Sequence, residues 1–284
     1  MLISAKEIIN KSLELLKRDF HIWILYMGIS FFSTLLGVLF AFNPTVLLFF
    51  ATLGISSFVV IVISMLLLLL LAVFNVWFNI ALVRTIHKRL FNTSPLSLKE
   101  QFAEVSHILP RTIGVSFIVG IIVFLPIILG IVGLTITNFE SILWGGLKNT
   151  IALYIFFGVL GFYGIFHLVY FSTKYVFSYY YVTIEEKHIR ESLHQGQSLV
   201  HGRMGEIFWR LAAPVILFFL VYILSNYIFT ALARAIGGTF ITTVANLLSL
   251  AVSSGVALLT VIATVILFED AKTKVLTPPV VKKG

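Results

Sequence analysis

Four polar side chains share one helical stripe inside a long apolar stretch of this sequence. Tyr163, His167, Tyr170 and Lys174 are separated by four, three and four residues, which places them on one helix face. Polar and ionisable groups are costly inside a membrane and are therefore functional candidates. We expect this stripe to point to the interior of a helical bundle and to line a cavity. The alternative is that Lys174 extends to the membrane–water interface and the tyrosines form an aromatic belt there.

Asparagines in three other apolar stretches complete the candidate polar cavity. Asn75 and Asn79 lie one helical turn apart, and Asn246 heads a stripe of small polar residues. Together with Asn226 they would form a polar pathway. Amides and hydroxyls also join neighbouring membrane helices, so close packing is the alternative explanation. The residues of the stripe after Asn246 are Ser249, Ser253, Thr260 and Thr264.

The sequence gives little support to metal or enzyme chemistry. It contains no cysteine, and His188, His194 and His201 do not have the i, i+4 spacing of a helical zinc site. No glycine-rich phosphate loop, nucleophile elbow or intramembrane carboxylate pair is visible. We therefore expect no metal ion, no cofactor and no enzymatic activity.

The composition is that of a membrane protein. Of 284 residues, 59% are hydrophobic and 11% are charged, and the mean hydropathy is +1.05. Soluble domains contain about 25% charged residues. The net charge of +8 is typical of a membrane protein with basic cytoplasmic loops. We expect membrane lipids as partners, and no nucleic acid.

Six apolar runs are each long enough to cross a bilayer, which requires about 20 residues per helix. They predict an all-α fold, a polytopic membrane bundle of six transmembrane helices in a single domain, 1–284. Residues 45–53 precede the second run and are expected to form an interfacial or re-entrant segment. The six runs are 22–42, 58–83, 113–136, 151–176, 208–229 and 240–267.

The distribution of basic residues predicts the orientation. Of the 20 Lys and Arg residues, 18 lie before the first run, in the connections 84–111 and 174–210, or beyond residue 267. Positively charged connections stay on the cytoplasmic side during insertion. We therefore expect both termini in the cytoplasm, 271–284 as a flexible cytoplasmic tail, and a location in the inner or plasma membrane.

The chain is predicted to repeat one unit three times, a short amphipathic cytoplasmic helix followed by a hairpin of two spans. The units are expected near 1–96, 97–182 and 183–270. The Ser-x-x-Glu pattern of the first two copies is a capping box, which begins a helix. Amphipathic connections occur in many six-span proteins, and this is the alternative to duplication. Ser4, Glu7 and Arg18 recur 93 residues later as Ser97, Glu100 and Arg111, and Arg203 follows 92 residues further on.

The amphipathic helices themselves are read from the segregation of charge. In the first copy Ile8 belongs to an apolar face and Lys11 to a charged one. Such a helix is expected to lie flat on the membrane. The third copy is looser, with Thr183 and Glu186 as its candidate cap.

One segment resembles a known family of membrane domains. Residues 174–186 lead from an aromatic span into an acidic turn, Glu191-Ser192-Leu193 follows, and 196–203 end in a Ser-Leu, Gly-Arg pattern. This resembles the six-span membrane domain attached to some bacterial glycerophosphoryl diester phosphodiesterases, and related uncharacterised membrane families. The resemblance implies the fold and not the activity, because the phosphodiesterase chemistry of that family resides in a separate soluble barrel domain.

We therefore expect a non-enzymatic membrane scaffold or assembly partner in envelope or lipid physiology, with a cytoplasmic or membrane protein as its partner. The alternative is a transporter or lipid-handling protein that uses the polar stripes, with Lys174 or Arg84 meeting an anionic headgroup. An intramembrane enzyme has the least support, because acid, base and nucleophile must come within hydrogen-bond reach and no such set is evident.

Overall fold

Six helices long and apolar enough to cross a membrane are present in the computed structural model, which describes residues 2–40, 52, 56–91, 98–144 and 147–276. Every regular element in these residues is helical. The predicted fold class, an all-α multi-pass membrane protein, is therefore confirmed. The expected segment 45–53 lies outside the described residues, apart from Thr52. The six spans are α2 (Phe20–Phe40), α4 (Ser57–Leu90), α6 (Leu109–Trp144), α7 (Leu147–Tyr175), α10 (Met204–Ile236) and α11 (Thr239–Leu276).

Several spans are longer than a bilayer requires. Helix α11 has 38 residues, which gives a length of about 57 Å against a hydrocarbon core of about 30 Å. It continues through Leu276, so the first six residues of the predicted tail 271–284 are helical. The reason is local: Lys274 pairs with Asp270 one turn earlier at 2.8 Å, and Ala271 is buried. The excess length carries charged residues beyond the apolar stretch.

Short helices precede each pair of spans. They are α1 (Ala5–Arg18), α5 (Leu98–Val105) with the 3-10 turn η1 (Ser106–Ile108), and α9 (Ile189–Val200). One further short helix, α8 (Ser178–Ile184), follows α7. The order of short helix, span and span thus occurs three times along the described chain. This order agrees with the expected unit, while threefold duplication stays a prediction.

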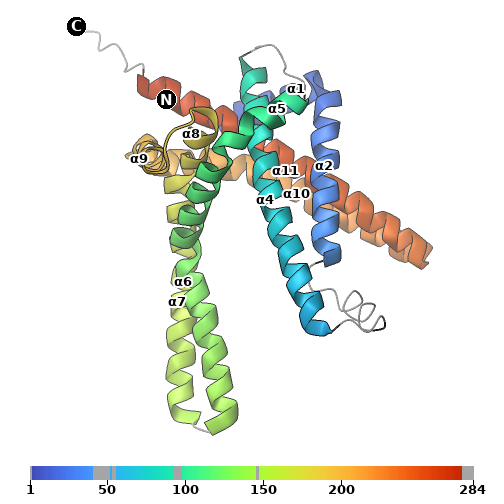
Figure 1. Cartoon of the computed structure of the whole chain (residues 1–284), viewed down its shortest axis with the longest axis vertical. Helices are drawn as coiled ribbons and strands as arrows, with labels where there is room; N and C mark the ends of the chain where they lie inside the picture. Colours follow the sequence, from blue (N-terminus) through green and yellow to red (C-terminus); the bar gives the residue numbers. More distant parts are fainter. Residues whose placement is uncertain (1, 41–51, 53–55, 92–97, 145–146, 277–284) are drawn as a thin grey trace. The chain divides into compact units, whose positions relative to one another are not determined.

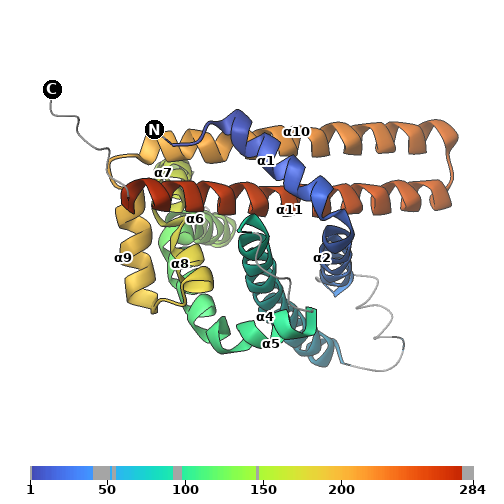
Figure 2. The ribbon, with the colours of Figure 1, turned by 90° about the horizontal axis from the view of Figure 1, so that it is seen from above.

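The contacts divide the chain into two compact units, each described by itself. The first comprises Met1–Leu109 with Phe208–Gly284, and the second comprises Pro110–Ile207. The single domain, 1–284, and the repeat units stay predictions. Within the first unit α1 and α2 pack on α11, and α4 packs on α2, α5 and α11. Figures 1 and 2 show α10 and α11 side by side as an antiparallel hairpin, with α1 lying across α11.

Helix α1 begins as the sequence predicts and then packs differently. Ser4 accepts a hydrogen bond from the Glu7 amide at 3.2 Å, which confirms half of the expected capping box. The apolar face, however, is covered by protein, because Ile8 and Leu15 are buried and α1 packs on α11. The expectation that this face lies on the membrane is therefore wrong. The amphipathic pattern is the same in both cases, since α11 offers the same apolar surface that lipid would.

In the second unit, glycines bring α6 and α7 together as a hairpin (Figure 1). A Cβ added at Gly130 would lie 3.4 Å from the Cα of Gly161, and one at Gly164 would lie 2.8 Å from a side-chain carbon of Ile127. Such close backbone approach is how membrane helices gain packing energy where lipid removes the hydrophobic driving force.

A second close approach joins α8 to α9. A Cβ on Gly196 of α9 would lie 2.6 Å from the amide nitrogen of Ser178, the first residue of α8. The predicted cap of the third copy is wrong in this region. Thr183 donates to the Tyr179 carbonyl at 2.8 Å inside α8, and α9 begins after His188. The extra helix α8 occupies the residues that were expected to start the amphipathic helix.

Candidate functional site

A small cavity lies where α2, α4 and α11 meet in the first unit. Its volume is about 120 Å³, enough for several water molecules. Asn75 and Asn79 of α4 line it, as expected from their shared helix face, and Ser254 contributes from α11. Tyr26 and Ser30 of α2 complete its polar lining.

Hydrogen bonds along this seam hold α2 against α4. The Tyr26 hydroxyl and the Thr85 hydroxyl are 2.8 Å apart, and Ser33 donates to the side-chain oxygen of Asn75 at 2.9 Å. The side-chain amide of Asn79 donates to the backbone carbonyl of Asn75 at 2.7 Å, within the same helix. Asn75 therefore joins two helices, while Asn79 keeps its side-chain oxygen free of any partner in the described part of the chain.

The asparagines of the last hairpin lie elsewhere. Ser249 of α11 donates to Asn226 of α10 at 2.9 Å, which fastens these two helices. Asn246 is exposed, and no described residue hydrogen-bonds to it. Neither residue lines the cavity between α2, α4 and α11. The polar pathway expected from the asparagines of all three spans is therefore not assembled within this unit.

The stripe on α7 belongs to the second unit and points in more than one direction. Tyr163 and Tyr170 are 57% and 48% exposed, so they do not face an interior as expected. His167 turns toward α6 and donates from Nε2 to the Ile122 carbonyl at 2.7 Å. Lys174 lies over aromatic rings of its own helix. The helical spacing is regular, but α6 covers only the His167 position of the stripe, and Tyr163 and Tyr170 stay exposed.

Charged residues gather at one end of the first unit around Asp19. Asp19 is the C-cap of α1 and is 6% exposed. Its carboxylate accepts from Arg18 and from Arg89 of α4, each at 3.2 Å, and Arg18 donates to the Arg89 carbonyl at 2.8 Å. Trp23, fully buried, donates to the Leu15 carbonyl at 3.0 Å. We call Arg18, Asp19 and Arg89 the Asp19 junction.

Three further contacts between ionisable side chains fasten α4 to its neighbours. Glu104 of α5 accepts from Arg84 at 3.1 Å and from Lys88 at 2.8 Å. His87 lies 3.2 Å from Glu269 of α11. Since Arg84 is nearly buried and paired with Glu104, the expectation that it meets a lipid headgroup loses its basis.

In the loop before α9, the pKa of Lys187 is shifted. Lys187 lies 2.8 Å from Glu191, and this hydrogen bond and the negative charge of Glu191 raise the pKa of the lysine above its usual value. Arg111 of α6 donates to the Glu186 carbonyl beside it at 3.2 Å. His188 and His201 are the caps of α9, and His194 lies inside it. Among the described residues, no three His, Cys, Asp or Glu side chains are grouped to hold a metal ion.

The sequence analysis missed most of the residues that build these sites. Tyr26, Ser30 and Ser33 follow one another at i, i+4 and i+7 in the first span, a stripe that the same reasoning would have selected. Asp19 carried a weaker signal as the acid directly after the last basic residue of α1. The partners Thr85 and Arg89 depend on tertiary packing and carried no signal of their own.

No family model, curated protein or solved structure matches this chain in the comparisons made with known proteins.

Proposed function

We propose that this multi-pass membrane protein is a non-enzymatic scaffold in the inner or plasma membrane, and that α1 is its docking surface for a cytoplasmic protein. The observation that supports this most is how α1 is held. Its apolar side is buried on α11, the Ile3 amide donates to Asp270 at 2.7 Å, and the Asp19 junction fixes its other end. The charged side of the helix, together with exposed Leu13, is left to meet another molecule.

That side, the α1 charged face, carries both signs of charge. Lys11 and Glu7 form an exposed pair at 3.3 Å, which contributes little to stability. A mixed face suits a protein of complementary charge pattern better than a uniformly anionic bilayer. The α1 charged face consists of Lys6, Glu7, Lys11, Glu14 and Lys17, all of them exposed.

The pairing of polar groups inside the spans supports a structural role in envelope or lipid physiology rather than catalysis. Asn75 is bonded to Ser33, Asn226 to Ser249, and His167 to a carbonyl of α6. Such hydrogen bonds between membrane helices account for these polar groups without a catalytic role. The excess of basic residues in the connections supports the cytoplasmic placement of α1 and of both termini.

The test is site-specific photocrosslinking in cells. A photoreactive residue at Lys11 or Glu14 should form one discrete protein adduct, and the same residue at lipid-facing Leu69 should not. Reversing the charges of Lys6, Lys11 and Lys17 to Glu should remove the adduct, whereas Arg190→Glu on α9 should leave it. The absence of an adduct at Lys11, or saturable solute movement by the purified protein alone in liposomes, would contradict the scaffold function.

The cavity between α2, α4 and α11 favours a second candidate, a transporter or lipid-handling protein. It is lined by hydroxyls and amides from three helices, and the Asn79 side-chain oxygen is still available. This function requires a hydrated pathway by which water reaches the cavity. Replacement of Ser30 or Ser254 by Cys in this cysteine-free chain should then allow reaction with a small water-soluble thiol reagent. Leu69→Cys is the lipid-facing control, and equal protection of all three positions would exclude the pathway.

A further inference from the structure

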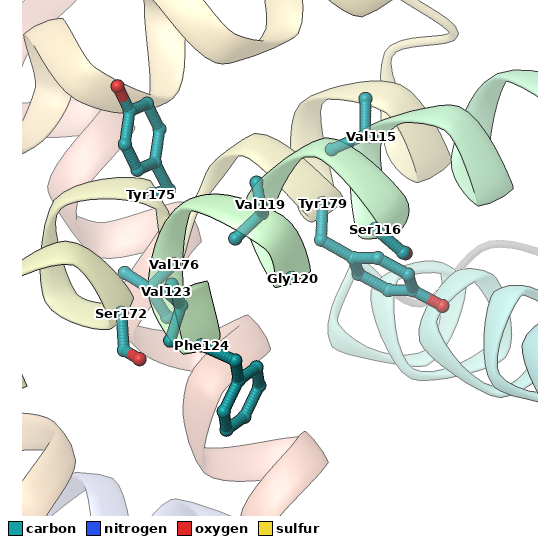
Figure 3. Close-up of a pocket in the computed structure, with 10 residues that line it drawn as sticks. All are labelled: Val115, Ser116, Val119, Gly120, Val123, Phe124, Ser172, Tyr175, Val176 and Tyr179. Carbon is teal, nitrogen blue, oxygen red and sulfur yellow. The ribbon is translucent and has the colours of Figure 1, made fainter. Parts of the chain in front are cut away.

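A second and larger cavity lies between α6 and α7 in the second unit. Its volume is about 320 Å³, at the lower end of the range for small-ligand pockets. Val119 and Val123 of α6 line it together with Ser172 of α7 and Val176 of the turn that follows α7 (Figure 3). The rings of Phe124, Tyr175 and Tyr179 lie around this space (Figure 3).

The shape of the cavity depends on a missing side chain. Gly120 of α6 lines it, and a Cβ added there would meet no atom within 4 Å. Its walls are mainly valine and aromatic carbon, and an apolar cavity of this kind does not hold water well. In a membrane, lipid acyl chains surround the protein, and one such chain can fill an apolar cavity of this kind.

Lys174 lies beside the cavity, and no carboxylate of the described residues pairs with its ammonium group. The Lys174 ammonium lies 5.9 Å, 5.5 Å and 5.7 Å from the ring centres of Tyr170, Phe171 and Tyr175. These ring contacts are its only interactions within the described part of the chain. Lys187, Lys88 and Lys274, by contrast, are each paired with an acid at 2.8 Å.

The aromatic rings position this charge and leave it able to bind an anion. Tyr175 contacts the ammonium and also lines the cavity, so the charge and the apolar space are adjacent. Lys174 lies near the end of the span that the distribution of basic residues assigns to the cytoplasm. Anionic headgroups are abundant at the cytoplasmic surface of membranes.

We propose that this region binds one anionic phospholipid, with an acyl chain in the α6–α7 cavity and its phosphate on Lys174. The proposal is independent of the scaffold function, because it rests on the second unit and not on α1. A free phosphate would satisfy Lys174 but leave the cavity unfilled. A zwitterionic lipid would fill the cavity but gain less from the unpaired charge.

The test uses the whole chain in vesicles with a photoreactive group on the lipid acyl chain, attached to phosphatidylglycerol or to phosphatidylcholine. Gly120→Leu fills the cavity and should lower labelling by phosphatidylglycerol about tenfold, the effect of losing about 1.4 kcal/mol of binding. Gly158→Leu, at an exposed glycine of α7 where an added Cβ also meets nothing within 4 Å, should label like the native chain. Ser172→Phe at the lining repeats the test if Gly120→Leu does not fold.

The headgroup is tested on the same vesicles. In Lys174→Met, the ratio of labelling by phosphatidylglycerol to labelling by phosphatidylcholine should fall to about one. Lys174→Arg should keep the ratio of the native chain, since Arg keeps the charge and the ring contacts. Soluble glycerol phosphate in excess should not compete. Equal labelling of Gly120→Leu and Gly158→Leu would overturn the chain site. An unchanged preference in Lys174→Met, or equal labelling by both lipids in the native chain, would overturn the headgroup site.

Discussion

The Arg89 guanidinium lies 3.2 Å from the Asp19 carboxylate and ties the end of α4 to the elbow between α1 and α2. Arg18, beside Asp19, returns a hydrogen bond to the Arg89 carbonyl at 2.8 Å. In the second unit Arg111, the expected counterpart of Arg18, donates to the Glu186 carbonyl at 3.2 Å. In both places an arginine near the start of a pair of spans donates to a distant backbone carbonyl, 71 residues further on inside α4 for Arg18 and 75 residues further on, after α8, for Arg111. The duplication of the repeat unit stays a prediction.

Removal of the Asp19 charge should destabilise the first unit. Asp19→Asn leaves the guanidinium of Arg89 without its anion in a partly buried position, at a cost of about 2 kcal/mol. Thermal unfolding in detergent should occur about 4 °C or more lower. Glu14→Gln on the exposed side of α1 is the matched control and should unfold like the native chain. If Asp19→Asn and Glu14→Gln unfold at the same temperature, the junction does not stabilise the fold.

The glycine contact between α6 and α7 predicts a disulfide. The chain has no cysteine, so Ile127→Cys with Gly164→Cys gives a single pair. A Cβ added at Gly164 lies 2.8 Å from Cγ1 and 3.5 Å from Cα of Ile127, which places the two Cβ atoms close enough to bridge. Mild oxidation in the membrane should join them, as measured by mass spectrometry after proteolysis between the helices. Ile127→Cys with Gly158→Cys, where the second residue is exposed and an added Cβ meets nothing within 4 Å, should stay reduced. If the control pair forms a disulfide and the tested pair does not, the register of α6 against α7 is not the one described above.

Gly196 is expected to be intolerant of a side chain. An added Cβ would overlap the backbone of Ser178, so Gly196→Ala must push α9 away from α8. Overpacking of this kind typically costs about 1–3 kcal/mol. The measurement is hydrogen exchange of the α8 and α9 amides, which should become faster. Gly205→Ala, at a glycine where an added Cβ meets nothing within 4 Å, is the control. Unchanged exchange in Gly196→Ala would contradict the close contact.

The titration of Lys187 should depend on Glu191. Because the hydrogen bond and charge of Glu191 raise the lysine pKa in the folded protein, the pair contributes stability below the ordinary lysine pKa. That stability is lost as the pH rises through the raised pKa. Glu191→Gln should lower the pKa of Lys187, measured by NMR of labelled lysine side chains, and Gln195→Ala should change it much less. Equal titration of Lys187 in the native chain and in Glu191→Gln would refute this assignment.

The spans and the short helices could be predicted because hydropathy and helical periodicity are local properties. Ser4 caps α1 as its sequence pattern predicts, and Asn75 and Asn79 share a cavity because they share a helix face. The exposure of Tyr163 could not be foreseen, since it depends on which helix lies opposite α7. In a membrane, lipid and protein offer similar apolar surroundings. An apolar helix face can therefore be covered by lipid or by protein, and the sequence pattern is the same in both cases. For this reason the packing of the apolar face of α1 on α11 was not predicted.

The central claim is that six spans cross one membrane with α1, α9 and the end of α11 on the cytoplasmic side. The most direct measurement is labelling of single cysteines in intact cells with a membrane-impermeant maleimide. Gly238→Cys, between α10 and α11, should react, whereas Lys11→Cys and Arg190→Cys should react only after the cells are opened. Reaction of Lys11→Cys and Gly238→Cys from the same side of the membrane would contradict this topology.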